Sequence, residues 1–216
     1  MRTRVKICGC TSVDDVALAL DAGADAVGVI LAESSERRVN IERFRDIAAA
    51  VPALIPLVAV FVDPTASLVD EALKVGALPQ FHGHEPAEAC EAFAAGPYLK
   101  AYHVQDGRPP SRADFAAFAR PFEHATWIFD TAGASGRSGG TGRPFAWETA
   151  LDLAGGRRFV VSGGLTPENV GDCVRAVHPY AVDVRSGVET NGAKDPDKVR
   201  AFVRAVREAD AEIAGV

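Results

Sequence analysis

Cysteine and aspartate end two apolar runs of the chain, and both side chains can move protons. Cys8 ends the run Arg4–Cys8, with Lys6 two residues before it, and Asp130 ends the run Thr126–Asp130. A carboxyl group can give or take a proton, and a thiol can take one once it has ionised. Alone, Cys8 fits a small core residue and Asp130 fits a turn cap. If the fold brings the two to one mouth, they predict acid–base chemistry.

Three glycine-rich segments in the second half of the chain are suited to binding phosphate: Ser138–Gly142, Ser162–Gly164 and Arg185–Gly187. Glycine lets the backbone approach a ligand closely and turn its N–H groups toward an anion. One such segment alone would be a tight turn, but three together favour a phosphate site. The candidate phosphate-binding residues are Gly140, Thr141, Gly142, Gly163, Gly164, Ser186 and Gly187.

The chain offers further polar side chains beside apolar runs. Arg37 and Arg38 are adjacent, and a planar guanidinium suits a substrate carboxylate, although one of the two is expected to be a solvated loop charge. Asp183 lies inside an apolar run, where a carboxylate needs a partner. Lys6 is the expected partner, provided that the first and last strands adjoin.

The sequence predicts no metal site. Cys8 and Cys10 form a C-x-C pair, which is too little for metal binding without clustered partners. The motif C-x-x-C, which thiol redox chemistry uses, is absent. We therefore expect neither a metal ion nor a redox role for these thiols.

Short apolar runs alternate with helical patterns along the whole chain, and several runs are rich in valine and isoleucine, as buried parallel strands are. The expected strands are Arg4–Cys8, Asp25–Leu31, Ile55–Val62, Leu78–Phe81, Leu99–His103, Thr126–Asp130, Arg158–Ser162 and Ala181–Arg185. Two stretches, 105–115 and 131–146, are rich in Gly, Pro, Ser and Arg and are expected to be loops.

Three helices are predicted from apolar residues spaced i, i+3, i+4, i+7, which form one stripe on a helix. The stripes are Val13, Val16, Ala17 and Leu20; Val170, Cys173, Val174 and Val177; and Val199, Phe202, Val203 and Val206. Thr166-Pro167 and Asp195-Pro196 read as a helix cap followed by a proline in the first turn. Gly23 and Gly76 follow helices where a left-handed residue is needed.

Eight strictly alternating units predict an α/β fold, a single-domain (β/α)₈ barrel (a TIM barrel) over residues 1–216. An open, doubly wound sheet is the alternative. It would need a nucleotide-binding G-x-G-x-x-G after the first strand, and Cys8-Gly9-Cys10-Thr11 is not one. In such a barrel, active sites lie at the carboxyl ends of the strands, and phosphate is commonly bound after strands 7 and 8.

The composition limits the partners of the chain. The net charge is −6 without a basic block, which argues against nucleic acid and anionic membranes as partners. Hydrophobic residues make up 48% of the chain, enough for a sizeable core. The cysteines form no secreted disulfide pattern, and we see no signal peptide or membrane span, so a cytoplasmic protein is expected.

Nearly the whole chain resembles the phosphoribosylanthranilate isomerase family of tryptophan biosynthesis, because a set of family motifs occurs in the family's order. The motifs are Lys6-Ile7-Cys8-Gly9-x-Thr11, Gly23-Ala24-Asp25-Ala26-x-Gly28, Gln80-x-His82-Gly83, Phe129-Asp130, Gly139-Gly140-Thr141-Gly142, Gly163-Gly164-Leu165-x-Pro167-Glu168-Asn169-Val170, Asp183-Val184-x-Ser186-Gly187-Val188-Glu189 and Lys194-Asp195. No single motif decides the matter, but the ordered set is specific.

The resemblance implies an Amadori rearrangement without metal or cofactor, in which a ribosyl ring opens and an imine becomes an aminoketose. It would make Cys8 the base and Asp130 the acid, and would place Arg37 on the anthranilate carboxylate. Its motifs also put Gln80, His82 and Asp183 among the substrate-binding residues. It further implies a phosphorylated small-molecule substrate and a monomer or homodimer.

The chain departs from the family pattern at several positions. Glu36 and Arg38 stand in a turn that usually reads Ser-Pro-Arg-aromatic, and Arg185 stands where a serine is usual. Cys10 and Ser162 replace more usual apolar or small residues. The strand expected at Leu78–Phe81 holds Pro79, which would interrupt the hydrogen bonds of a central strand.

Two alternative functions stay open. One is another barrel isomerase or an epimerase acting on a different sugar phosphate. A ribulose-phosphate type of epimerase would want paired acids and metal-ligating histidines at strand ends, and only His82 and His103 stand there. The other is a non-catalytic protein that keeps the phosphate site, which the presence of both Cys8 and Asp130 argues against.

Overall fold

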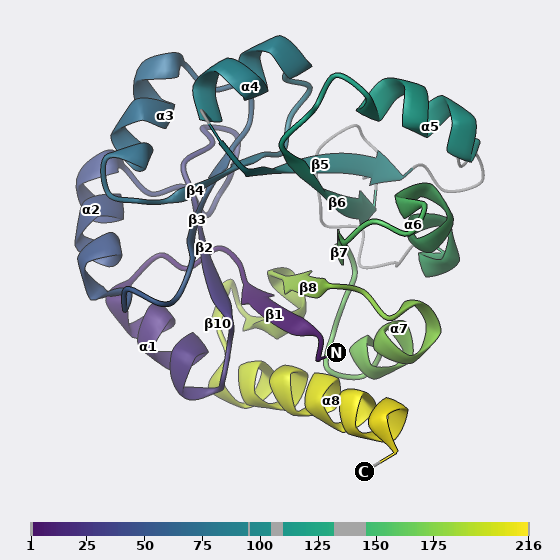
Figure 1. The fold of residues 1–216 in the computed structure, drawn as a ribbon. Coiled ribbons are helices and arrows are strands. Elements are labelled where there is room, and N and C mark those ends of the chain that lie inside the picture. Colours follow the sequence, from purple (N-terminus) through teal and green to yellow (C-terminus); the bar gives the residue numbers. More distant parts are fainter. Residues whose placement is uncertain (1, 95, 105–109, 132–145, 216) are drawn as a thin grey trace.

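The chain folds into a closed barrel of eight parallel strands, each hydrogen-bonded to the next, with the last strand beside the first (Figure 1). The computed structural model describes residues 2–94, 96–104, 110–131 and 146–215. The strands are β1 (Arg4–Ile7), β2 (Ala26–Ile30), β3 (Leu57–Phe61), β4 (Leu78–Phe81), β5 (Tyr98–Val104), β6 (Ala125–Thr131), β7 (Phe159–Val161) and β8 (Ala181–Val184). Each predicted strand is confirmed, with ends that differ by at most two residues.

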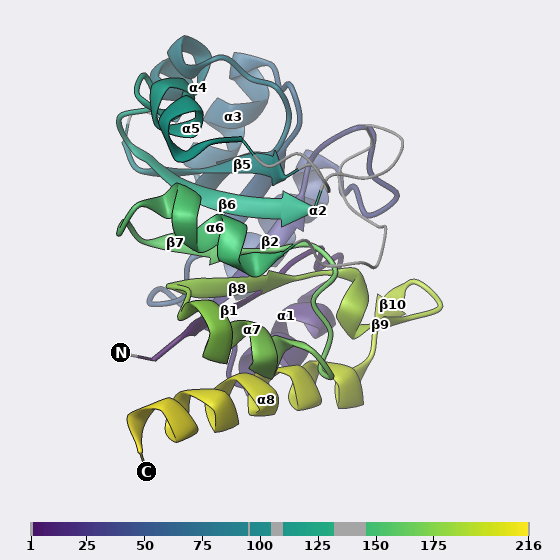
Figure 2. The ribbon, with the colours of Figure 1, turned by 90° about the vertical axis from the view of Figure 1, so that its right-hand side faces the viewer.

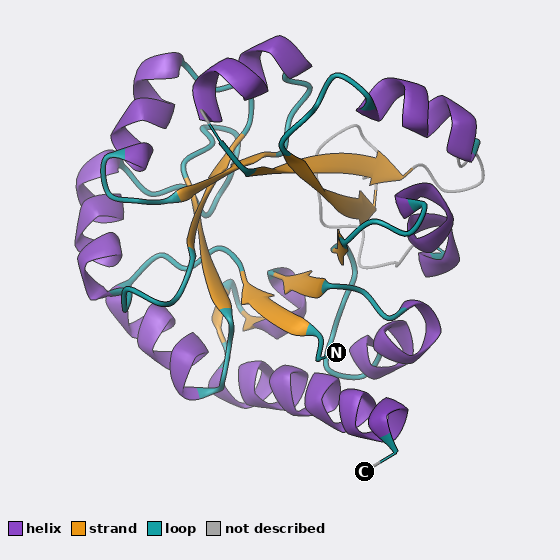
Figure 3. Ribbon diagram, in the orientation of Figure 1, coloured by secondary structure: helices purple, strands orange, loops and turns teal. Residues whose placement is uncertain are grey.

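Helices form a ring outside the strands (Figure 3). They are α1 (Val13–Asp21), α2 (Ile41–Ala50), α3 (Ala66–Leu73), α4 (Ala87–Ala94), α5 (Arg112–Ala119), α6 (Trp147–Ala154), α7 (Val170–Val177) and α8 (Pro196–Ala214). A short 3-10 helix η1 (Ser186–Val188) and a two-stranded hairpin, β9 (Glu189–Thr190) and β10 (Ala193–Lys194), lie between β8 and α8. None of the helices in the described ranges is both long and apolar enough to cross a membrane.

Side-chain alternation along the strands decides which residues reach the interior of the barrel. On β1, Val5 and Ile7 join the large apolar cluster that also holds the buried helix residues. Lys6 and Cys8 take the opposite side and are buried inside the barrel. The same alternation turns Asp130 inward, because Phe129 belongs to the outer cluster. The barrel interior therefore collects the polar residues that the sequence analysis singled out.

Most of the predicted helix signals are confirmed. The stripes of α7 and α8 are fully buried, and the Asp195 side chain caps α8 by accepting from the backbone N–H groups of Asp197 and Lys198. Gly23 and Gly76 both have positive φ angles, of 93° and 77°.

Two helix predictions are wrong in detail. Val13 and Ala17 of the predicted α1 stripe are exposed, because the helix turns Val16 of that stripe and Ala19, which was not predicted, toward the core. Thr166-Pro167 does not begin α7, which starts at Val170 with Asn169 as its N-cap. The residues between form a turn in which Thr166 N–H donates to the Asn169 side chain at 2.8 Å.

Two loop expectations also change. Residues 105–115 were expected to be a loop, but α5 begins at Arg112. The start signal is Ser111, whose side-chain oxygen accepts from Asp114 N–H at 3.1 Å, and Ser111 Oγ in turn donates to the Asp114 carboxylate. Most of the second expected loop, 131–146, lies outside the described residues. Thr131 ends β6, and Ala146 is the residue before α6.

The strand predicted at Leu78–Phe81 forms although Pro79 lies within it. β4 runs through the proline, with Leu78, Pro79 and Gln80 in register with Val58, Ala59 and Val60 of β3. The loss of one N–H is tolerated here because the strand is held by both neighbouring strands, β3 and β5.

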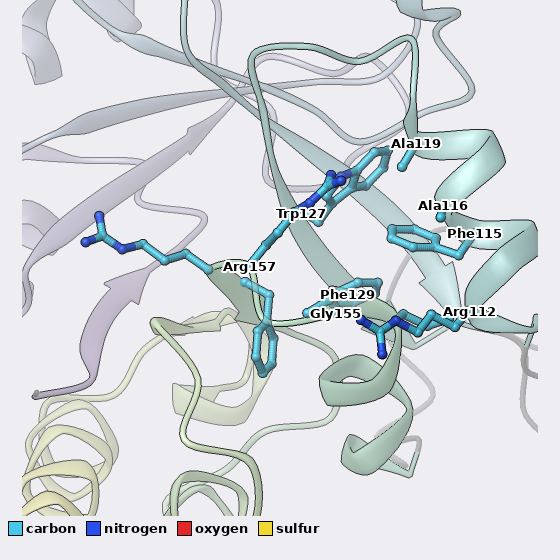
Figure 4. A pocket seen from close by; sticks show the side chains of 12 residues that line it. Arg112, Phe115, Ala116, Ala119, Trp127, Phe129, Gly155 and Arg157 are labelled. Carbon is cyan, nitrogen blue, oxygen red and sulfur yellow. The ribbon is translucent and has the colours of Figure 1, made fainter.

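A cavity of about 110 Å³ lies outside the barrel, between α5 and the turn that follows α6. Figure 4 shows the rings of Phe115, Trp127 and Phe129 around it, with the guanidinium of Arg112 at its edge. Trp127 and Phe115 are also packed against each other, with ring centroids 5.1 Å apart. Of the described residues that line this cavity, none belongs to the predicted site, which lies at the barrel mouth.

Candidate functional site

The predicted acid–base residues follow or end strands on the same end of the barrel. Cys8 directly follows β1, Asp130 is the second-last residue of β6, and the parallel strands of a barrel all end at one mouth. Figure 2 shows β6 and β8 pointing the same way, with the β9–β10 hairpin at their carboxyl ends. The expectation that Cys8 and Asp130 share one mouth is therefore met by the topology.

Cys8 shares a buried corner of the barrel with an ion pair. Lys6 Nζ donates to Asp183 Oδ1 at 2.9 Å, and these two side chains are each only 5% exposed. The pairing predicted from sequence is confirmed, because Lys6 and Asp183 are direct partners across β1 and β8. Gly28 makes room for the cluster: a Cβ there would lie 2.9 Å from Cys8 Sγ and 3.0 Å from Lys6 Nζ.

The charges of this corner act on the thiol in opposite directions. Burial raises the pKa of Cys8, and the nearby Lys6 ammonium lowers it by a smaller amount, so the net shift is upward from 9.0. Burial also lowers the pKa of Lys6, but Asp183 and Cys8 outweigh burial and raise it. Lys6 therefore stays charged beside a thiol that is protonated at neutral pH.

Asp130 is held by a histidine. His82 Nε2 lies 3.0 Å from Asp130 Oδ2, and Gln80 Nε2 lies 3.1 Å from His82 Nδ1. Burial alone would raise the pKa of Asp130, but the hydrogen bond and charge of His82, helped by His103, lower it below 3.8. The structure thus joins three residues of the predicted set, Gln80, His82 and Asp130, into one chain of contacts.

The loop after β7 packs directly against this acid. Gly163 has a φ of 81°, and a Cβ at this position would lie 2.3 Å from Asp130 Oδ1. Only glycine allows so close an approach. The candidate phosphate loop and the candidate acid are therefore neighbours.

The loop after β8 makes a second close backbone contact. A Cβ at Gly187 would lie 1.9 Å from the carbonyl oxygen of Leu165. Gly187 belongs to η1, whose first residue, Ser186, is exposed. The segments after β7 and β8 thus touch each other, as expected of a shared site. Gly140, Thr141 and Gly142, the third predicted segment, lie outside the described residues.

Replacing Gly187 with alanine is expected to force these two loops apart. The methyl group would overlap the Leu165 carbonyl, so we expect a loss of about 1–3 kcal/mol in the free energy of unfolding. We also expect inorganic phosphate to bind more weakly. Urea unfolding and phosphate titration would measure both, with Ser186→Ala as the control for stability only, because it removes a hydroxyl without a clash. Unchanged stability in Gly187→Ala would contradict the close contact.

The two arginines of the β2 loop lie in different surroundings. Arg37 is partly buried, and its Nη2 donates to Glu189 Oε2 of β9 at 3.2 Å. Glu189 is in turn held by Lys194 Nζ at 2.8 Å. Arg38 is exposed and pairs only with the exposed Glu33 among the described residues. The prediction that one of the two arginines is a solvated charge is confirmed, and that arginine is Arg38.

Three residues that depart from the family pattern, Arg185, Cys10 and Ser162, contact the backbone or neighbouring residues near the ends of the strands. Arg185 lays its side chain over Gly9, with its Cγ 3.1 Å from where a Cβ of Gly9 would be. Cys10 is fully buried and its thiol donates to the Ile7 carbonyl at 3.8 Å. Ser162 is buried and its N–H bonds to the Phe129 carbonyl at 2.8 Å.

A second buried ion pair, not predicted from the sequence, lies at the turn that follows His82. Lys100 Nζ donates to Glu85 Oε2 at 2.8 Å and to the Gly83 carbonyl at 2.7 Å. Glu85 also accepts from the N–H groups of Asp63 and Gly83. This pair fixes the turn that follows His82. A lysine within the apolar strand β5 was the available signal.

His103 is a further neighbour that the sequence analysis placed at a strand end without a role. Its Nε2 lies 2.9 Å from the carbonyl oxygen of His82, and the two rings meet edge to face with centroids 5.1 Å apart. Burial, followed by the charge of His82, lowers the pKa of His103. His103 is therefore a neutral ring that contacts His82 at neutral pH.

Comparison with known proteins gives a family for this arrangement. The model of the N-(5'-phosphoribosyl)anthranilate (PRA) isomerase family matches residues 5–205. A relative of that name from Pseudomonas aeruginosa (strain LESB58) is 44% identical over 208 residues, which is 94% of this chain and 95% of that protein. The chain belongs to the PRA isomerase family.

Solved structures of the family have the same fold. The phosphoribosyl anthranilate isomerase of Thermotoga maritima matches with a TM-score of 0.82 and 34% identity, over 95% of this chain and 99% of that one. A PRA isomerase bound to reduced 1-(o-carboxyphenylamino)-1-deoxyribulose 5-phosphate matches with a TM-score of 0.78 and 33% identity over the same shares. Another solved structure holds monomers generated from the dimeric T. maritima enzyme.

Family membership confirms the resemblance drawn from the motifs. The chain is an enzyme, an aldose–ketose isomerase of tryptophan biosynthesis. The open doubly wound sheet is excluded by the closed barrel. The match over 94% of this chain also argues against the epimerase and the non-catalytic binding protein.

Proposed function

We propose that this PRA isomerase uses Asp130 as the acid and Cys8 as the base in the Amadori rearrangement of phosphoribosylanthranilate to 1-(2-carboxyphenylamino)-1-deoxyribulose 5-phosphate. The observation that carries the assignment is the placement of two proton-transfer groups at one mouth. Each lies beside a side chain that lowers its pKa, which is Lys6 for Cys8 and His82 for Asp130. The whole reaction lies within the one barrel domain.

The proposed reaction begins with two proton transfers by the named side chains. Asp130 gives a proton to the ring oxygen of the ribosyl group, the bond between that oxygen and C1 breaks, and a protonated imine forms. Cys8 then takes the proton from C2 to leave an enolamine, which becomes the ketone by gaining a proton at C1 and losing the proton of the C2 hydroxyl. The thiolate of Cys8 would be stabilised by Lys6, and the proton that Asp130 gives would be replaced from His82, 3.0 Å away.

The substrate-free protein holds both groups in the opposite protonation states. Cys8 keeps its proton because burial raises its pKa, and Asp130 is ionised because His82 lowers its pKa. For the proposed roles, entry of the substrate has to coincide with loss of the thiol proton of Cys8 and with protonation of Asp130.

Two loops are proposed to bind the phosphate. The segments Ser162–Gly164 and Ser186–Gly187 meet at the carboxyl ends of β7 and β8, next to the amino end of η1. Their backbone N–H groups can bind an anion without positive side chains. Gly140, Thr141 and Gly142 complete the proposed phosphate-binding set, and Gln80, His82 and Asp183 complete the substrate-binding set. We further propose a cytoplasmic enzyme that needs no metal or cofactor, either a monomer or, like the T. maritima enzyme, a dimer.

A fluorescence assay tests the reaction directly. The purified protein is mixed with freshly generated phosphoribosylanthranilate without added metal or cofactor, and the anthranilate emission is followed. A fall in emission that depends on the protein supports the proposal. No turnover in a protein that still binds phosphorylated ligands would overturn it, and would point to Arg38 and Arg185 as marks of another substrate.

The rate is expected to rise with pH between 7 and 9. A thiol whose pKa lies above 9.0 is mostly protonated over this range, so its thiolate fraction grows about ten-fold per pH unit. If Cys8 is the base, kcat/KM should increase with that slope until another group limits it. Initial rates at low substrate concentration would measure it. A flat or falling profile would instead fit a thiol that donates the proton.

Arg37→Ala is expected to weaken substrate binding more than it slows turnover. Removing the guanidinium would take away a partner of the anthranilate carboxylate, so KM should rise by about ten-fold or more, with a smaller change in kcat. Steady-state kinetics would measure both. Arg38→Ala is the matched control, because Arg38 is an exposed neighbour that pairs only with Glu33 in the described structure. Equal effects of the two substitutions would remove Arg37 from the site.

A further inference from the structure

Three side chains at the barrel mouth carry ligand atoms that converge. One atom each from His82, His103 and Asp130 lies within 4.8 Å of the other two. Two imidazoles and a carboxylate are a ligand set that Zn²⁺ and similar divalent transition-metal ions prefer, whereas Mg²⁺ and Ca²⁺ prefer oxygen ligands. The contact of Asp130 with the two histidines joins the ends of three different strands, β4, β5 and β6, and is not visible in the sequence.

The free ring nitrogen of His103 points to a ligand. Its other ring nitrogen, Nε2, is 2.9 Å from a carbonyl oxygen and must therefore carry the proton. This leaves Nδ1 with a lone pair, and Nδ1 is buried with no hydrogen-bond partner in the described part of the chain. A histidine that donates one N–H to a backbone carbonyl and keeps the other nitrogen free has the arrangement found around bound metals.

The other two side chains are held in a similar way. His82 has one ring nitrogen 3.0 Å from Asp130 and the other 3.1 Å from Gln80. Asp130 Oδ1 is buried, and within the described ranges it has no hydrogen-bond partner. Gln80 Nε2 is a donor as placed, but Gln80 Oε1 is buried without a hydrogen-bond partner among the described residues. With the amide turned over, this oxygen would accept the Nδ1 proton of His82 and leave Nε2 of that ring free for the ion, as outer partners of metal ligands do.

The distances require only small side-chain movements. Around a tetrahedral Zn²⁺, with bonds of about 2.0–2.2 Å, ligand atoms lie roughly 3.3–3.6 Å apart. The His82–Asp130 separation of 3.0 Å is already close to this value, and the other separations are at most 4.8 Å. Side-chain rotations that move the ligand atoms by about an ångström would bring all three within bonding distance of one ion.

We propose that His82, His103 and Asp130 bind one divalent transition-metal ion of the Zn²⁺ type, and that the bound ion inhibits the isomerase. Inhibition follows because the ion takes the Asp130 carboxylate and displaces the proton between it and His82. This part rests on the proposed role of Asp130, whereas the binding of the ion does not. The three protein ligands leave a fourth position for water, so the ion needs no further side chain.

Zn²⁺ binding to tag-free protein tests the site without using turnover. Calorimetric titration in a buffer free of thiols and chelators should show one Zn²⁺ per chain. His103→Gln removes the free ring nitrogen but keeps an amide that can donate to the His82 carbonyl, and it should weaken Zn²⁺ binding by at least about ten-fold. Equal Zn²⁺ affinity in the wild type and in His103→Gln would overturn the site.

Cys8 is the competing ligand, and Co²⁺ separates the two. Co²⁺ bound to nitrogen and oxygen ligands absorbs in the visible range but lacks the intense near-ultraviolet band of a thiolate complex. Cys8→Ser should therefore bind Co²⁺ as the wild type does, with the same spectrum. A thiolate band that disappears in Cys8→Ser would place the metal on the cysteine and overturn the proposal.

Turnover then tests the inhibition. Zn²⁺ should abolish isomerisation by the wild-type protein, and a chelator should restore it. With each protein compared to its own metal-free rate, His103→Gln should need about ten-fold more Zn²⁺ than the wild type for half inhibition. A protein that binds Zn²⁺ through His103 but isomerises nothing would refute the proposed function and leave the site standing. If the protein isomerises the substrate but Zn²⁺ inhibits the wild type and His103→Gln equally, the proposed function stands and the metal site is refuted.

Discussion

Cys8→Ala and Asp130→Asn are each expected to lower kcat by about 10²–10⁴-fold, the usual contribution of a positioned acid or base. The two substitutions remove different steps, so either one alone should be nearly sufficient to stop turnover. Both change the shape of the site little: alanine removes only one sulfur atom from the interior, and asparagine has the shape of aspartate. Rates from the fluorescence assay, with the affinity for inorganic phosphate measured beside them, would show the effect.

The phosphate measurement separates a chemical loss from a structural one. Gly163 touches Asp130, so a collapsed acid site would disturb the candidate phosphate loop as well. Unchanged phosphate affinity with lost turnover would assign the two side chains to the chemistry. Near-normal turnover in either variant would show that its assigned role is wrong. His82→Gln offers a graded comparison, because it keeps an amide near Asp130 but cannot carry the charge that lowers its pKa.

The architecture could be predicted because its signals are local and repeated. Each strand is a short apolar run, and eight of them in alternation with helices leave few topologies. The pairing of Lys6 with Asp183 followed from the closure of the barrel alone. The prediction was weakest where two faces of one helix are similar: α1 has apolar residues on several sides, so its predicted stripe included Val16 correctly but also the exposed Val13 and Ala17, and it left out Ala19.

The site was harder to predict because its contacts join residues far apart in sequence. The motifs supplied Asp130 and His82 separately, but their contact depends on how the ends of β4 and β6 face each other across β5. His103 was visible at a strand end, yet its bond to the His82 carbonyl requires the backbone path of the turn. The protonation states of Cys8 and Asp130 depend on burial, which no spacing rule gives.

The Lys6–Asp183 pair should show the largest effect on stability of any single substitution discussed. Both side chains are buried, so Lys6→Met leaves the Asp183 carboxylate without a partner in the barrel interior. Breaking a buried pair in this way costs about 3–5 kcal/mol in the free energy of unfolding. Because Asp183 and Cys8 raise the pKa of Lys6, the charged lysine contributes stability that is fully present below its ordinary pKa of 10.5 and is lost as the pH rises through the higher folded-state pKa.

The double variant Lys6→Met/Asp183→Asn separates the contribution of this pair to stability from the effect of Lys6 on the pKa of Cys8. It buries no charge, so its free energy of unfolding should lie well above that of Lys6→Met, and urea unfolding of all three proteins would measure the difference. Additive losses would contradict a coupled pair.

The double variant, although its fold is restored, should remain a poor enzyme, because Cys8 has lost the ammonium that lowers its pKa. Its kcat/KM should rise only at a pH higher than in the wild type. A rescued fold with a displaced pH profile would show that Lys6 acts on the base, whereas a rescued fold with the wild-type profile would confine Lys6 to stability.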